Sequence, residues 1–89
     1  MKAVLTVVGQ DKIGIIAAVS NCLSEHKVNI LDIHQTTMQE YFTMMMLVDT
    51  ASCTVDFATL QAKLAELGKS IQEDIRIQHA DIFNSMHRV

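Results

Sequence analysis

The stretch Thr6-Val7-Val8-Gly9-Gln10-Asp11-Lys12-Ile13-Gly14-Ile15-Ile16-Ala17 decides the fold of this chain, because two kinds of apolar pattern meet in it. The apolar and β-branched residues up to Val8 predict a strand, and the apolar residues from Ile15 onward predict a helix. A short polar loop with one acidic and one basic residue lies between them. The stretch therefore predicts a strand, a loop and a helix whose first backbone N–H groups face the loop.

The loop from Gly9 to Gly14 suits a small ligand that carries both a carboxylate and an amine. Backbone N–H groups at a helix start attract a carboxylate, and Asp11 can accept a hydrogen bond from an ammonium group. The two glycines do not form either of the common glycine-rich phosphate-binding motifs. A plain strand–helix turn, in which Asp11 only caps the helix, is the alternative interpretation.

Composition limits the classes of protein to consider. A length of 89 residues, 49% of them hydrophobic, predicts one domain over residues 1–89 that association with a second copy would stabilise. A net charge of −3 and scattered basic residues argue against a nucleic-acid partner. Cys22 and Cys53 form no C-x-x-C pair and the histidines have no metal-ligand spacing, so neither a metal nor another cofactor is expected. The absence of a long apolar run predicts a cytoplasmic protein without a membrane partner.

Apolar periodicity along the chain predicts the element order β-α-β-β-α-β. Strands are expected over residues 2–8, 27–38, 41–49 and 70–79, and helices over 15–26 and 56–67. Gln39 and Glu40 are expected at a hairpin tip, Thr54 (with Asp56 as the alternative) at the cap of the second helix, and Gly68 at its end. This order predicts an α+β ferredoxin-like sandwich, with two helices on one face of a four-stranded antiparallel sheet. The first and third strands are expected at the centre of the sheet.

The third predicted strand carries apolar side chains on both of its faces. One face holds Phe42, Met44, Met46 and Val48, and the other holds Tyr41, Met45 and Leu47. Two helices can cover only one face, so the second apolar face needs another cover. The extension over residues 80–89 is the expected cover, from the same chain or a partner, because Ile82, Phe83 and Met86 have helical spacing. The pattern predicts a homodimer or a larger assembly.

Other proteins with this element order use residues that this chain lacks. Metal chaperones carry paired cysteines after the first strand, and RNA-recognition domains carry aromatic residues on the first and third strands. Acylphosphatase-like enzymes carry an arginine in the first loop, where this chain has Lys12. No serine has an evident base or oxyanion partner. No catalytic residue is therefore predicted, and the chain is not expected to be an enzyme.

Three segments together resemble ACT domains, which are small regulatory modules that bind amino acids. Asp11-Lys12-Ile13-Gly14-Ile15 resembles the D-x-P-G-[IL] motif, with Ile13 in place of proline. Val28-Asn29-Ile30-Leu31-Asp32-Ile33 resembles the x-N-I-x-x-I start of the ACT second strand. With residues 77–88 included, the whole chain is similar to a family of stand-alone bacterial and archaeal ACT proteins.

The resemblance implies a non-catalytic regulatory domain that binds an amino acid, or a similar small molecule, between two copies. The first loop of one copy would face the second-strand start of the other. The implied ligand-binding residues are Gly9, Gln10, Asp11, Lys12, Ile13, Gly14, Asn29, Ile30, Leu31 and Asp32. Another regulatory protein is a further candidate partner. The alternative is a structural module that acts through protein–protein interaction without a ligand, since Ile13 lacks the fixed φ of proline.

Overall fold

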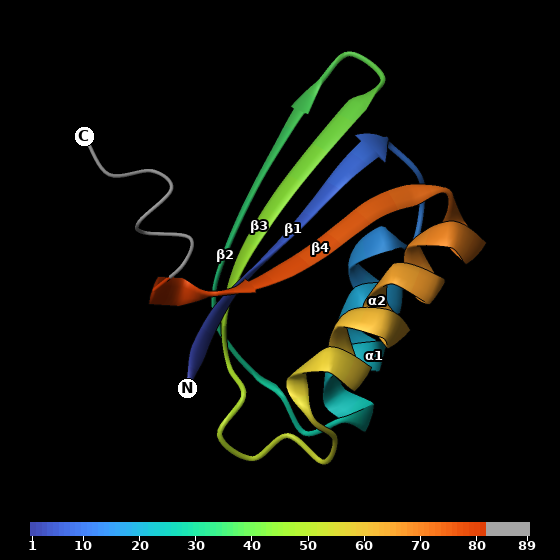
Figure 1. The fold of residues 1–89 in the computed structure, drawn as a ribbon. Helices are drawn as coiled ribbons and strands as arrows, with labels where there is room; N and C mark the ends of the chain where they lie inside the picture. The colour runs from blue at the N-terminus through green and yellow to red at the C-terminus, as the bar shows by residue number, and fades with distance from the viewer. Residues whose placement is uncertain (82–89) are drawn as a thin grey trace.

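The computed structural model describes residues 1–81, which form two layers (Figure 1). The elements follow in the order β1 (Lys2–Gln10), α1 (Ile15–Glu25), β2 (Asn29–Met38), β3 (Tyr41–Asp49), α2 (Phe57–Ile71) and β4 (Glu73–His79). The strands form one antiparallel sheet in the order β2-β3-β1-β4. Both helices lie on the same side of this sheet (Figure 1). The predicted ferredoxin-like fold, with the first and third strands at the centre, is confirmed.

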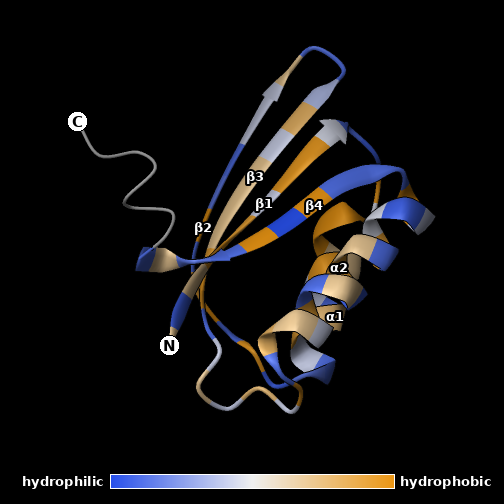
Figure 2. Cartoon of the chain, in the orientation of Figure 1, coloured by the Kyte–Doolittle hydropathy of each residue, from blue (hydrophilic) through white to orange (hydrophobic). Residues whose placement is uncertain are grey.

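The core lies between the sheet and the helices, and strand alternation selects the side chains that enter it. Every second residue of β1 from Ala3 to Val7, and of β3 from Phe42 to Val48, points toward the helices and is buried. This set comprises Ala3, Leu5, Val7, Phe42, Met44, Met46 and Val48. The helices contribute Val19, Leu23, Leu60 and Leu64. The alternation of polar and apolar residues is also visible along β4 in Figure 2. The opposite residues of each strand therefore face away from the helices.

The start of α2 differs from the preferred prediction. Asp56 is the N-cap, and its carboxylate accepts a hydrogen bond from the backbone N–H of Thr59 at 3.0 Å. Hydrogen bonding from Thr59 also holds the pKa of the Asp56 carboxyl below its usual range. Thr54 was the wrong choice, because its backbone N–H donates to the carbonyl of His26 in the turn before the helix. The alternative cap named from the sequence is the correct one.

The prediction that Gly68 ends α2 is wrong. The helix continues to Ile71 and ends at Gln72, which has a left-handed φ of 59° and donates its N–H to the Gly68 carbonyl. Gly68 is buried, and a Cβ atom there would lie 2.5 Å from the carbonyl oxygen of Glu73. This position therefore needs glycine because β4 approaches the helix closely, and not because the backbone turns there.

The second face of the sheet is open over the part of the chain that the structure describes (Figure 1). Val8, Tyr41 and Met45 are exposed on it, and Val4 and Leu47 are half-buried. This agrees with the predicted apolar face of the third strand. Residues 82–89 lie outside the described residues, so their role as a cover stays a prediction. None of the helices within residues 1–81 is long and apolar enough to cross a membrane.

A truncation after His79 tests the proposed cover. Two apolar side chains kept from water by the extension contribute about 3–6 kcal/mol, at about 1.5–3 kcal/mol each. We therefore expect the truncated chain to melt at a lower temperature and to bind a hydrophobic dye more strongly than the full chain. Equal melting temperature, solubility and dye binding in both chains would show that residues 80–89 do not cover this face.

Candidate functional site

The loop from Asp11 to Gly14 lies at one end of the sheet, between the end of β1 and the start of α1. The backbone N–H of Asp11 donates to the carbonyl of Glu40 at 2.7 Å, which ties the loop to the tip of the β2–β3 hairpin. Ile13 is fully exposed, with a relative accessibility of 106%. The loop is thus anchored at its base and exposed at its tip.

The start of α1 has no side-chain cap. Gly14 occupies the cap position with φ 90° and ψ 5°, a left-handed conformation that glycine adopts without steric cost. No acidic residue lies in the first turn, and Asp11 does not accept a hydrogen bond from it. The interpretation of Asp11 as a simple helix cap is therefore wrong. The first N–H groups of α1 are left for solvent or for a ligand.

An open groove of about 560 Å³ lies beside this helix start. Asp11, Lys12 and Gly14 line it from the loop, and Ile15, Ile16 and Ala17 line it from the first turn of α1. Gln35, Thr37 and Phe42 complete it from β2 and β3. Gln35 and Thr37 were not among the predicted site residues. The signal that could have identified them is register, because they pair with the buried Met44 and Phe42 and so lie on the helix side of the sheet.

The second half of the predicted site lies at the opposite end of the sheet. Asn29 pairs with Asp49, which pairs with Lys2 at the beginning of β1, whereas the loop follows the end of β1. At a strand rise of about 3.3 Å per residue, the two ends of β1 are roughly 25 Å apart. One chain therefore does not bring the loop and the residues from Asn29 to Asp32 together.

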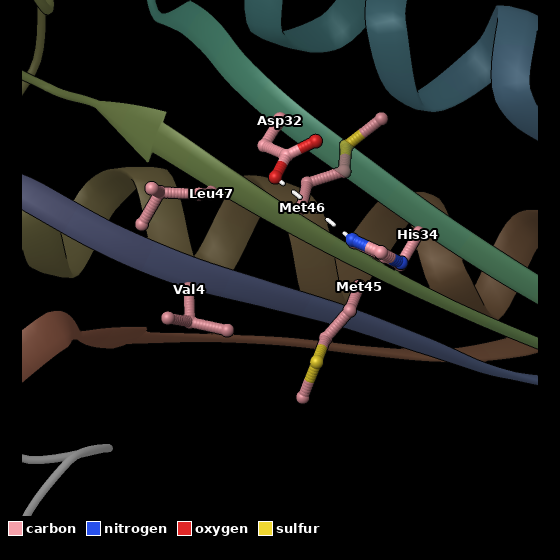
Figure 3. A pocket seen from close by; sticks show the side chains of 6 residues that line it. All are labelled: Val4, Asp32, His34, Met45, Met46 and Leu47. Carbon is pink, nitrogen blue, oxygen red and sulfur yellow. Dashed lines mark ion pairs between the residues drawn. The ribbon is translucent and has the colours of Figure 1, made fainter.

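The residues at the start of β2 do not all point the same way. A bulge between Ile30 and Asp32 interrupts the pairing with β3 and leaves Leu31 exposed at the edge. The carboxylate of Asp32 lies on the open face, 3.9 Å from Nε2 of His34 (Figure 3). Both side chains line a small hollow of about 120 Å³ over the apolar residues Val4, Met45 and Leu47. Asp32 therefore lies on the face of the sheet opposite the groove.

Two of the predicted loop residues have partners inside the fold. The Lys12 ammonium donates to the carbonyls of Ile71 at 2.8 Å and Gln72 at 3.2 Å, and it lies 3.6 Å from a carboxylate oxygen of Glu73. Gly9 lies directly against the same carboxylate, because a Cβ atom at this position would come within 2.4 Å of it. Sequence alternation had placed Glu73 on the face of Ile75 and Ile77, but the contact with Lys12 depends on tertiary structure.

The remaining polar groups do not form a metal site within residues 1–81. In this part of the chain, no group of three or more histidine, cysteine, aspartate or glutamate side chains lies close enough together to hold a metal ion. The described cysteines are not disulfide-bonded, and burial raises the pKa of the Cys22 thiol above its usual value. The candidate site is therefore the groove beside α1, where the first N–H groups of the helix lie near the Asp11 side chain.

Comparisons with known proteins agree with the predicted family. The ACT domain family matches residues 2–78. A UPF0237 protein from Clostridium acetobutylicum is 56% identical over the full length of both chains. A UPF0237 protein from Methanocaldococcus jannaschii is 47% identical over 99% of this chain and 98% of its own. These relatives show that the similarity extends over bacteria and archaea.

Solved structures support the same assignment. An ACT domain protein from Streptococcus pneumoniae has a TM-score of 0.82 and 46% identity, and the match covers 93% of each chain. The regulatory subunit of aspartate kinase from Thermus thermophilus has a TM-score of 0.66 at 21% identity, over 86% of this chain and 50% of its own. The latter shows only a shared fold. The chain belongs to the ACT domain family and, within it, to the UPF0237 proteins.

Proposed function

We propose that this ACT domain is a non-catalytic regulatory module that binds an amino acid between two copies of itself. The observation that carries the proposal is the placement of the two candidate segments at opposite ends of the sheet. A second copy is needed to bring them together, and β2, an outer strand, lines the groove at the start of α1. Ligand binding would then alter the association of the pair with another regulatory protein.

The edge of β2 offers a surface for this pairing. It is an outer strand of the sheet, and Leu31, Ile33 and Met38 on it are exposed. Long exposed edges with apolar residues readily pair with another strand. Antiparallel pairing of two β2 strands about a two-fold axis would bring the start of β2 in the second copy beside the end of β2 in the first. The start of β2 in the second copy would then close the groove near Gln35 and Thr37.

Each part of an amino acid has a matching group in such a closed groove. The ligand carboxylate would accept from the free N–H groups in the first turn of α1, with the helix dipole adding to the attraction. The ligand ammonium would donate to Asp11, which lines the groove. The second copy would add the amide of Asn29, the first residue of β2, which can both donate and accept. Asp11 is favoured over Asp32 as acceptor, because Asp11 lines the groove.

The surroundings of Cys22 and His26 also favour a non-catalytic role. A reactive cysteine needs a lowered pKa, whereas burial raises the pKa of Cys22. His26 Nδ1 lies 2.8 Å from the backbone carbonyl oxygen of Cys22, so this ring nitrogen is hydrogen-bonded to the backbone. Neither group has the arrangement that an activated nucleophile requires.

A thermal-shift assay with each standard amino acid, combined with light scattering, tests the proposal. We expect a dimer of about twice the 9.9 kDa chain mass. We also expect that one amino acid, present at 100 times its dissociation constant, will stabilise the folded chain by about 2.7 kcal/mol. A monomer at micromolar concentration, or a melting temperature that no amino acid changes, would contradict the proposal.

The exposed side chain of Ile13 favours a second candidate function, an interaction module without a ligand. A fully exposed isoleucine at a loop tip is an apolar contact surface for another protein. Under this alternative the pair of copies forms but no amino acid changes its melting temperature. The same assay therefore separates the two functions.

A further inference from the structure

We infer that Lys12 and Glu73 are positioning residues, whose contacts inside the fold hold the loop at the start of α1 in place. The Glu73 side chain is fully buried on the helix side of β4, and both of its carboxylate oxygens lack a hydrogen-bond partner. A buried carboxylate is costly unless a cation compensates it. The Lys12 ammonium, 3.6 Å away, supplies that charge from the loop.

The end of β1 is shaped for this carboxylate. Gly9 pairs in register with Glu73 on the neighbouring strand, so the two residues lie on the same face of the sheet. A Cβ atom on Gly9 would lie 2.4 Å from one carboxylate oxygen and 2.9 Å from the other. The missing side chain of Gly9 therefore provides the space that the Glu73 side chain fills. This space lies three residues before Lys12, at the base of the loop.

Lys12 also completes the end of α2. The last carbonyls of a helix have no partner within the helix and carry a partial negative charge. The Lys12 ammonium donates to two carbonyls at this end, those of Ile71 and Gln72. One cation thus serves the buried carboxylate and the helix end together. The loop after β1 is thereby attached to the junction of α2 and β4, about sixty residues later in the chain.

These contacts give the loop a second anchor. The first anchor is the hydrogen bond from the Asp11 N–H to the Glu40 carbonyl. The Lys12 contacts fix the next residue, so only Ile13 and Gly14 separate the anchored segment from α1. Ile13 does not restrain φ as proline would. The attachment of Lys12 supplies a restraint that presents the first N–H groups of α1 toward the groove.

Amide hydrogen exchange in the full chain, without any ligand, tests the inference. The probes are the amides of Asp11 and Ala18, which donate to the Glu40 and Gly14 carbonyls, and the Leu47 amide in the centre of the sheet reports global unfolding. In Lys12→Met we expect the Asp11 and Ala18 amides to exchange at least about tenfold faster than in the parent. Lys63→Met, which removes an exposed lysine of α2, should leave their exchange rates unchanged. Unchanged exchange rates of both amides in Lys12→Met would overturn the inference.

A double variant separates positioning from general stabilisation. In Lys12→Met/Glu73→Met the buried charge is absent, so the global stability should return toward that of the parent. The loop should nevertheless keep its fast exchange, because the ammonium is still missing. Recovery of slow exchange in this variant would contradict a positioning role.

A second experiment measures the affinity for the amino acid that raises the melting temperature of the parent most. Of the experiments on Lys12, only this one rests on the proposed function. Both the single and the double variant should bind it about tenfold more weakly than Lys63→Met does. Parent-like affinity in both variants would count against the inference. If no amino acid changes the melting temperature of the parent, the proposed function fails, while the exchange rates in the single and double variants still decide the role of Lys12.

Discussion

Replacement of Lys12 with methionine should lower the free energy of unfolding by about 2–3 kcal/mol. Removal of one partner from a buried ion pair costs about 3–5 kcal/mol, because the other charge stays buried without compensation. The loss should be smaller here, since the Lys12 side chain is 32% exposed and solvent screens part of the interaction. Urea denaturation near neutral pH measures the difference, which is a large share of the stability of a small domain.

Two comparisons control this measurement. Lys63→Met removes the same charge from an exposed position on α2 and should change the free energy of unfolding by less than about 0.5 kcal/mol. Lys12→Met/Glu73→Met should recover most of the loss, because no uncompensated charge remains in the core. A double variant that is as unstable as the single one would show that the Lys12 hydrogen bonds to α2, and not the buried charge, dominate.

Asn29→Ala and Asp11→Ala should each weaken amino-acid binding by about 1–3 kcal/mol, which corresponds to about 5–150-fold in Kd. Each change would leave a charged or polar ligand group without a hydrogen-bond partner. Both side chains are exposed, so the fold should survive both changes. Isothermal titration measures the affinities, and Glu66→Ala, which removes an exposed carboxylate of α2, serves as the control. Parent-like affinity in both variants would move the site elsewhere.

The elements that follow from local pattern were predictable from the sequence. The bounds of β3, Tyr41–Asp49, agree with the prediction because every second residue is apolar and a two-residue turn precedes it. The end of α2 was not predictable in the same way. Gly68 is a common helix terminator, but here it accommodates the backbone of β4, and Gln72 takes the left-handed position. That close approach exists only in the folded chain.

The candidate site also contains residues that local sequence predicts and residues that only the folded chain brings together. The loop from Asp11 to Gly14 and the start of α1 are contiguous in sequence, so the residues themselves indicate them. Gln35 and Thr37 join the groove only through strand register, and Glu73 reaches Lys12 only because β1 and β4 are neighbours. No sequence motif predicts that Lys12 contacts both a buried carboxylate and the end of a helix.

A mixing experiment tests the central claim, that two chains share each site. Asp11→Ala damages the loop half of the site, and Asn29→Ala damages the strand half. In dimers of either variant alone, both sites are damaged, but a mixed dimer contains one intact site and one doubly damaged site. After unfolding and joint refolding at equal concentrations, titration with the amino acid that stabilises the parent should show parent affinity at about a quarter of the sites. If the mixture binds no better than the separate variants, the site is not shared between two chains.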